Sequence, residues 1–245
     1  MTSKRRIDIE VSLVLGVSLG KSAVYSVLAL LTALLSKPGL SGSQTTINQS
    51  ASVVEFLDFS YQLVGMFFQW VPVALAAYLL GDLALTKLGI SWIKLGRQLL
   101  TGLALAASIG VPGLGLYLGA RALGLSAKVV PTDVNQYWWT VILLLLSAAT
   151  AAALEEGIMI GYIFNRFRER GLSDRKILWI SAVIRGSYHL YQGFGGFVGN
   201  LVMGLVFGQV YRRTGKLIPL LFAHFLLDAV IFVGYAWATT WLPLN

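Results

Sequence analysis

Long apolar runs alternate with short polar stretches along most of the chain. Seven apolar runs can be traced, at residues 11–35, 59–80, 99–123, 137–164, 177–191, 197–211 and 217–241. A helix that crosses a bilayer needs about 20 mostly apolar residues, so the pattern predicts an all-α, multi-pass bundle. We expect about seven membrane-spanning helices, or eight if one run forms a broken helix. The polar stretches at 37–56 and 125–135 are expected to be loops.

Two stretches depart from this simple alternation. The run at 99–123 contains Gly110-Val111-Pro112-Gly113 at its centre, and because proline removes a backbone donor we expect the helix to bend or break there. Residues 82–98 mix apolar side chains with three basic ones. This amphipathic stretch is expected to lie along the membrane surface.

Composition supports a membrane protein. Of the 245 residues, 56% are hydrophobic and 12% are charged, against about 25% charged in soluble domains. The chain has no cysteine, which excludes disulfides and cysteine-bound metals. We therefore expect a multi-pass protein of the cell membrane, with the lipid bilayer as its surroundings.

The net charge of +8 is explained by the distribution of the basic residues. If the N-terminus is cytoplasmic, 14 of the 19 Lys and Arg residues fall in cytoplasmic loops and three in outer ones. This asymmetry follows the positive-inside rule. It predicts a cytoplasmic N-terminus and removes the need for nucleic acid as a partner.

Adjacent carboxylates, Glu155 and Glu156, lie inside the fourth apolar run. A charge at the bilayer centre costs about 2.5–3.5 kcal/mol on insertion scales, so an intramembrane acid indicates a functional site with partners elsewhere in the chain. At 1.5 Å per residue, the polar residues of the later runs reach a depth similar to that of the two glutamates, roughly 10–18 Å from the cytoplasmic side. These residues are Arg185, His189, Asn200, His224 and Asp228.

A shared polar cavity in the cytoplasmic half of the membrane would gather these groups. His224 and Asp228 are four residues apart and therefore share a helix face, as do Arg185 and His189. Imidazole and carboxylate groups can bind a catalytic Zn²⁺ that activates water. They can also activate water directly, with a nearby donor stabilising the oxyanion. Both routes predict a hydrolase, and the sequence leaves the choice between them open.

The order of these groups resembles the CPBP family of intramembrane metalloproteases, also called the Abi or type II CAAX prenyl endopeptidase family. That family carries Glu-Glu-x-x-x-Arg, Phe-x-x-x-His and His-x-x-x-Asn/Asp on three membrane helices. The corresponding stretches here are Glu155-Glu156-Gly157-Ile158-Met159-Ile160, Arg185-Gly186-Ser187-Tyr188-His189 and His224-Phe225-Leu226-Leu227-Asp228. The resemblance covers about residues 137–233. It implies a catalytic core at 137–241, preceded by about three variable spans at 1–136.

The resemblance also implies roles for the residues. Glu155 corresponds to the general base for water, and Glu156 to a supporting or ligand carboxylate. Asn200 is expected to lie in the outer shell of the site. If a metal such as Zn²⁺ is bound, its expected ligands are Glu156, His189, His224 and Asp228. The implied reaction is hydrolysis of peptide bonds in membrane-associated or lipid-anchored proteins, including prenylated CAAX-type proteins.

Two positions depart from the family pattern. Ile160 replaces the motif arginine, and Arg185 replaces the phenylalanine before His189. In the family the arginine is thought to pair with the second glutamate. Since Arg185 lies one turn before His189, we predict that it substitutes as the partner of Glu156.

Two other functions are compatible with intramembrane acids and histidines. The loss of the motif arginine would suit a catalytically degenerate scaffold or a bacteriocin-immunity-type protein. A proton- or cation-coupled transporter would also use such groups, although the two-fold repeats common in transporters are not visible in this sequence.

Overall fold

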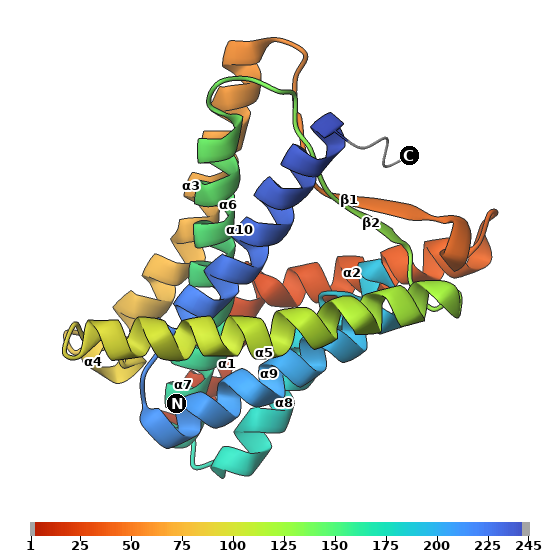
Figure 1. The fold of residues 1–245 in the computed structure, drawn as a ribbon. Coiled ribbons are helices and arrows are strands. Elements are labelled where there is room, and N and C mark those ends of the chain that lie inside the picture. Colours follow the sequence, from red (N-terminus) through yellow and green to blue (C-terminus); the bar gives the residue numbers. More distant parts are fainter. Residues whose placement is uncertain (1–2, 242–245) are drawn as a thin grey trace.

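The computed structural model describes residues 3–241, and most of these lie in helices (Figure 1). The elements run in the order α1 (Ser3–Gly16), α2 (Leu19–Leu35), η1 (Leu40–Gly42), β1 (Gln44–Gln49), α3 (Glu55–Leu80), α4 (Ala84–Leu88), α5 (Leu95–Ala122), β2 (Lys128–Asp133), α6 (Thr140–Glu155), η2 (Glu156–Tyr162), α7 (Ile163–Glu169), α8 (Asp174–Ser187), η3 (Leu190–Gln192), α9 (Phe194–Thr214) and α10 (Ile218–Trp241). The predicted all-α class is confirmed.

Several helices are suited to a bilayer. Within residues 3–241, five spans are long and apolar enough to cross a membrane: Glu55–Leu80, Leu95–Ala122, Thr140–Arg170, Phe194–Thr214 and Ile218–Trp237. Counting the bent pair α1 and α2 as one more span raises the number to six. The 14 residues of α8 fall short of that length. The predicted count of seven and the cytoplasmic N-terminus are not confirmed and stay predictions.

Two groups of helices diverge from a common base in Figure 1. In the first, α6 packs against both α3 and α10; in the second, α8 packs against α9, and α5 crosses both α9 and α10. The strands β1 and β2 pair in parallel, from Gln44 opposite Lys128 to Gln49 opposite Asp133. This two-stranded ribbon bridges the open ends of the two groups (Figure 1).

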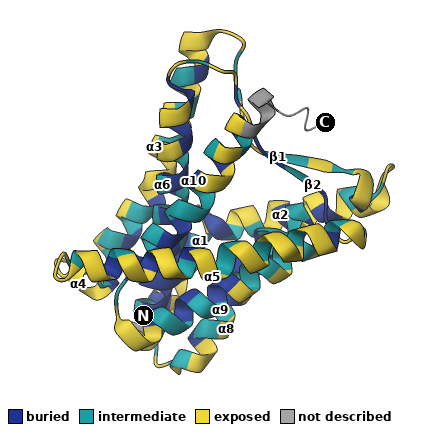
Figure 2. Cartoon of the chain, in the orientation of Figure 1, coloured by how far each residue is buried: buried dark blue, intermediate teal, exposed yellow. Residues whose placement is uncertain are grey.

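The largest cluster of buried apolar residues in the described part of the chain surrounds η2, where the first and second groups meet. Ile158, Met159 and Ile160 have no exposed surface, and neither has Tyr162. Figure 2 shows that exposed residues instead cover the outer faces of α3 and α5, as expected for helices that face lipid tails. The segment η2 therefore anchors the site residues in the buried core of the fold.

The structure corrects four sequence-based expectations. The run at 11–35 forms two helices bent by 54° near Gly16, where glycine and serine weaken the helix. In contrast, α5 continues through Pro112, so of the predicted bend or break the break does not occur, and the bend stays a prediction; spanning helices tolerate proline when neighbours accommodate the freed backbone group. The loops at 37–56 and 125–135 contain β1 and β2. The fifth run ends its helix at Ser187.

Candidate active site

Glu155 and Glu156 lie where the α-helix α6 passes into the π-helix η2. A π-helical turn is wider than an α-helical turn, and such segments occur often at functional sites. The apolar run at 137–164 had predicted an ordinary α-helix here. The wider turn changes the directions of the residues after Glu155, so spacing rules for an α-helix do not hold across it.

Glu156 is fully buried and bonded to two other helices. Arg185 of α8 donates from Nη1 to Oε2 at 3.0 Å, and its Nη2 donates to Oε1. His224 of α10 places Nδ1 2.6 Å from the same Oε1. The predicted pairing of Arg185 with Glu156 is thereby confirmed. Since a buried carboxylate without a partner is strongly destabilising, this contact is needed for the core as well as for the site.

Arg185 is itself placed by packing. Its guanidinium lies 5.6 Å from the centre of the Phe207 ring, and both residues are fully buried. Gly204 on α9 leaves room for the side chain, because a Cβ there would lie 3.2 Å from Arg185 Cδ. In the family pattern the arginine lies on the same helix as the two glutamates. Here the guanidinium of Arg185 reaches Glu156 from α8 instead.

Glu155 is in a different environment from Glu156. Its side chain keeps 14% of its surface exposed. Its Oε2 accepts hydrogen bonds from the Tyr188 hydroxyl at 2.8 Å and from Arg185 Nη2 at 3.2 Å. Of the two adjacent carboxylates, Glu155 is the one that a water molecule or substrate can reach.

His224 lies between two carboxylates. Its Nδ1 contacts Glu156, and its Nε2 lies 3.4 Å from Oδ2 of Asp228, one turn further along α10. A ring whose two nitrogens both face carboxylates donates to both only as an imidazolium. The side chain of Asp228 is 22% exposed, so this residue lies nearer the opening of the site.

His189 occupies the turn between α8 and η3 rather than the helix that was predicted for it. Its Nδ1 lies 3.1 Å from the backbone oxygen of Arg185, which accepts the bond. The ring packs against Tyr188 at 4.7 Å and Tyr191 at 6.2 Å between centroids. These contacts fix the ring and leave Nε2 as the nitrogen for chemistry.

Asn200 is not brought into this cluster. Its amide donates to the Gly196 carbonyl of its own helix at 3.0 Å. Its expected place in the outer shell of the site stays a prediction.

Two residues that sequence reasoning missed support the site. Tyr188 bonds to Glu155 and packs on His189. Ser26 of α2 donates to the Tyr188 carbonyl at 2.7 Å, which ties the N-terminal helices to the site. Tyr188 occupies an unspecified position of the Phe-x-x-x-His motif, so its only sequence signal was a hydroxyl beside His189.

The donors do not converge as a zinc site requires. Within residues 3–241, no group of three or more His, Asp or Glu side chains is arranged to hold a metal ion. The guanidinium of Arg185 supplies positive charge to Glu155 and Glu156, and His224 uses both nitrogens on carboxylates. In this arrangement the residues do not fit the ion, and the zinc prediction stays a prediction.

Comparison with known families bears on the same part of the chain. Residues 137–230 match the family model described as type II CAAX prenyl endopeptidase Rce1-like. Over these residues, which are less than half of the chain, the protein is similar to that family. This Rce1-like segment holds every predicted site residue, and the family that it resembles is described as a prenyl endopeptidase family. No curated protein and no solved structure matches the chain.

Proposed function

We propose that this protein hydrolyses peptide bonds of membrane-associated proteins with a water molecule activated by Glu155. The observation that carries the proposal is the difference in burial and bonding between the two adjacent carboxylates. Glu156 is buried and held by Arg185 and His224, whereas Glu155 keeps accessible surface. A general base must reach the water that it deprotonates, and Glu155 meets that condition.

The reaction follows from these positions. Glu155 accepts a proton from water as the water oxygen attacks the substrate carbonyl carbon. The carbonyl oxygen then carries negative charge, which a donor at the site must stabilise. When the carbon–nitrogen bond breaks, the proton passes from Glu155 to the leaving amine, and the products are a carboxylic acid and an amine; the acid then gives up its proton, leaving a carboxylate and an ammonium group.

His189 and the Arg185 cluster have separate roles in this proposal. His189 is held by its two tyrosine neighbours, with Nδ1 on the Arg185 carbonyl, and its Nε2 is the nitrogen available to the reacting groups. Arg185 and His224 hold Glu156 and keep the local charge balanced around Glu155. Asp228 orients His224 from the next helical turn. A zinc ion would need Glu156, His189, His224 and Asp228 to rearrange, and no step here passes through it.

The substrate class comes from the family description. We propose lipid-anchored proteins of the cell membrane as substrates, with prenylated CAAX-type chains as the first class to test. The bilayer would bring the anchored chain to the site from within the membrane plane.

The test is cleavage of prenylated and unprenylated membrane-anchored peptides by purified protein, with products identified by mass spectrometry. Glu155→Gln is expected to lose activity by a factor of about 10²–10⁴, the usual contribution of a general base. Asp82→Asn, at an exposed carboxylate, serves as the matched control. Retained activity in Glu155→Gln would refute the assignment, and absence of cleavage by the parent protein would favour the degenerate scaffold.

A further inference from the structure

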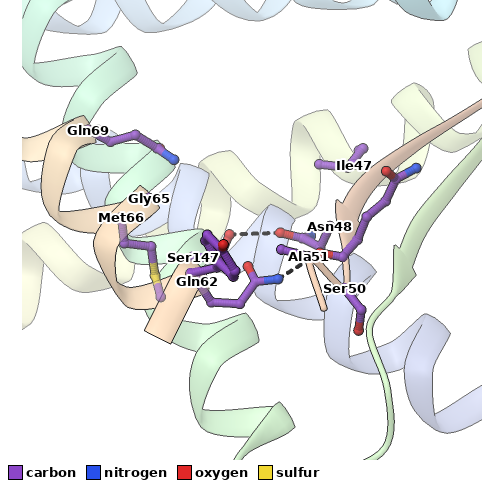
Figure 3. A pocket seen from close by; sticks show the side chains of 11 residues that line it. Ile47, Asn48, Ser50, Ala51, Gln62, Gly65, Met66, Gln69 and Ser147 are labelled. Carbon is purple, nitrogen blue, oxygen red and sulfur yellow. Dashed lines mark hydrogen bonds between the residues drawn. The ribbon is translucent and has the colours of Figure 1, made fainter. Parts of the chain in front are cut away.

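A second polar feature lies away from the carboxylates and bears on how the proposed substrate would bind. A pocket of about 370 Å³ is lined by β1, by one face of α3 and by Ser147 of α6. Figure 3 shows it on the side of β1 that faces away from β2. The side chains that line it carry no formal charge; the polar ones used below are Asn48, Gln62, Gln69 and Ser147.

Two amide side chains lie on α3, which is long and apolar enough to cross a membrane. Gln62 and Gln69 lie seven residues apart and share a face of α3, a candidate membrane span. Polar groups at such positions are costly without partners and indicate a function. Gln62 donates to the backbone oxygen of Gln49 in β1 at 2.6 Å. An N–H group of a neighbouring strand would make the same bond, so Gln62 occupies the place of such a donor.

The strand β1 has a free edge at this pocket. The sheet contains two strands within residues 3–241, and β1 uses one edge to pair with β2. Its other edge faces α3, where the Gln49 carbonyl bonds to a side chain rather than to a strand. Sheet edges of this kind bind extended peptides by adding a strand, with affinity from main-chain hydrogen bonds.

The pocket lies at a short distance from the proposed base. Ser147 donates to Asn48 at 2.9 Å and stands eight residues before Glu155 on α6, which corresponds to about 12 Å of helix. An extended chain covers that distance in about four residues, at roughly 3.3 Å each. A peptide held at β1 would thus place a bond about four residues away at Glu155.

We propose that the free edge of β1 and this pocket bind an extended, uncharged stretch of the substrate chain about four residues from the scissile bond. The inference rests on the proposed function. The occupant is a polypeptide because the pocket offers backbone and amide hydrogen bonds. A lipid tail would leave those groups unpaired, and a charged segment would find no counter-ion among the lining residues.

Gly65 allows the pocket to be filled without disturbing the protein. A Cβ at Gly65 would meet nothing within 4 Å, and leucine favours a helix more than glycine does. Gly65→Leu is therefore expected to fold normally and to raise KM about 10-fold with kcat unchanged, as loss of uniform binding does. Gly115→Leu is the matched control, since Gly115 also has open space on its helix α5 but lies outside the pocket.

Peptide chemistry supplies an independent test. In a fluorescent, prenylated peptide of about 12 residues, N-methylation of one amide at a time removes a single backbone donor. Alternate amides of a bound strand face the same edge, so we expect every second N-methyl group near the fourth residue to weaken binding about 10-fold. Uniform effects along the peptide, or none, would overturn strand addition.

The two proposals can fail separately. Binding of the fluorescent peptide is measured to Glu155→Gln, with and without Gly65→Leu, so that it does not depend on cleavage. Weaker binding with Gly65→Leu, together with no cleavage by the parent protein, would retain the peptide site and reject the protease. Equal binding with and without Gly65→Leu would reject the peptide site, whatever the cleavage assay shows.

Discussion

Arg185 shows how one side chain can serve a site from a different helix. The family pattern places an arginine four residues after the second glutamate, at the position of Ile160, whereas here the guanidinium comes from α8 and still bonds to Glu156. Ile160 is fully buried and could not carry an additional charge without a partner. The same charge balance is thus reached with the cation and the apolar residue exchanged between positions.

The exchange predicts an outcome for a charge-swap variant. Arg185→Phe alone leaves Glu156 buried without its main partner and should cost about 3–5 kcal/mol of folding free energy. Adding Ile160→Arg returns the family arrangement and should recover part of that loss. Thermal unfolding of the two single variants and the double variant in detergent measures the coupling. If the stability lost by the double variant equals the sum of the losses of the two single variants, the two positions are not equivalent.

Tyr188 is predicted to position the base. Tyr188→Phe removes the hydroxyl that donates to Glu155 at 2.8 Å but keeps the ring against His189. We expect kcat to fall about 10-fold with KM unchanged, because the lost bond orients the base rather than the substrate. Tyr78→Phe, at an exposed tyrosine, is the control. A change confined to KM would show that Tyr188 contacts the substrate instead.

At the scale of elements, glycines set the approach of α8 to α9. A Cβ at Gly204 would lie 3.0 Å from Ala182 Cα and 3.2 Å from Arg185 Cδ. Small residues at helix interfaces let backbones pack closely in membranes. The position of the arginine therefore depends on the spacing of these two helices.

Gly204→Val is accordingly expected to lower both thermal stability and activity, since overpacking typically costs about 1–3 kcal/mol. Gly199→Ala on the same helix is the control, because its Cβ would make an ordinary contact of 3.5 Å with Leu116. Loss of stability is measured by unfolding in detergent, and loss of activity by peptide cleavage. Equal behaviour of the two variants would contradict the proposed spacing role.

The sequence predicted the long helices well and the other elements poorly. The run at 217–241 anticipated α10 (Ile218–Trp241), and 59–80 anticipated most of α3, because the backbone of an apolar span must form its bonds within the helix. The strands were missed since their partners, near residues 44 and 128, are far apart in the chain. The π-helix at Glu156 has no local sequence signature and depends on packing around it.

The site was predictable to the extent that spacing and charge define it. Buried acids need partners, and that argument correctly joined Glu156 to Arg185. Tyr188 could not be predicted in this way, because its hydroxyl contacts Glu155 only through the turn that follows α8. Spacing and charge also do not decide whether the Asn200 side chain faces the cluster or, as observed, bonds to its own helix.

At the scale of the whole molecule, the N-terminal part of the chain bonds to the Rce1-like segment at three separate places. Glu10 of α1 bonds to Arg166, and Ser26 of α2 bonds to the backbone of Tyr188. Asn48 of β1 accepts from Ser147 of α6. These bonds cross the predicted division between residues 1–136 and 137–241. That division stays a prediction, and the contacts indicate that its two parts depend on each other to fold.

This dependence predicts the behaviour of a divided chain. Residues 137–245 produced alone lose the partner that fixes Tyr188 and the helix α3 that covers α6. We expect this fragment to aggregate in detergent and to lack activity. Production of residues 1–136 and 137–245 together should restore a monodisperse complex, because membrane helices can insert separately and then associate through packing and interhelical bonds.

A point variant of the undivided chain separates a role in folding from a role in catalysis. Ser26→Ala in the undivided chain removes one bond to the backbone of Tyr188 but leaves the helix interfaces intact. It should reduce kcat by a small factor, about 2–5-fold, with little change in unfolding temperature, since one hydrogen bond contributes about 1 kcal/mol. If residues 137–245 alone prove stable and active, the N-terminal helices are dispensable, and the links through Ser26 and Glu10 have no role in the site.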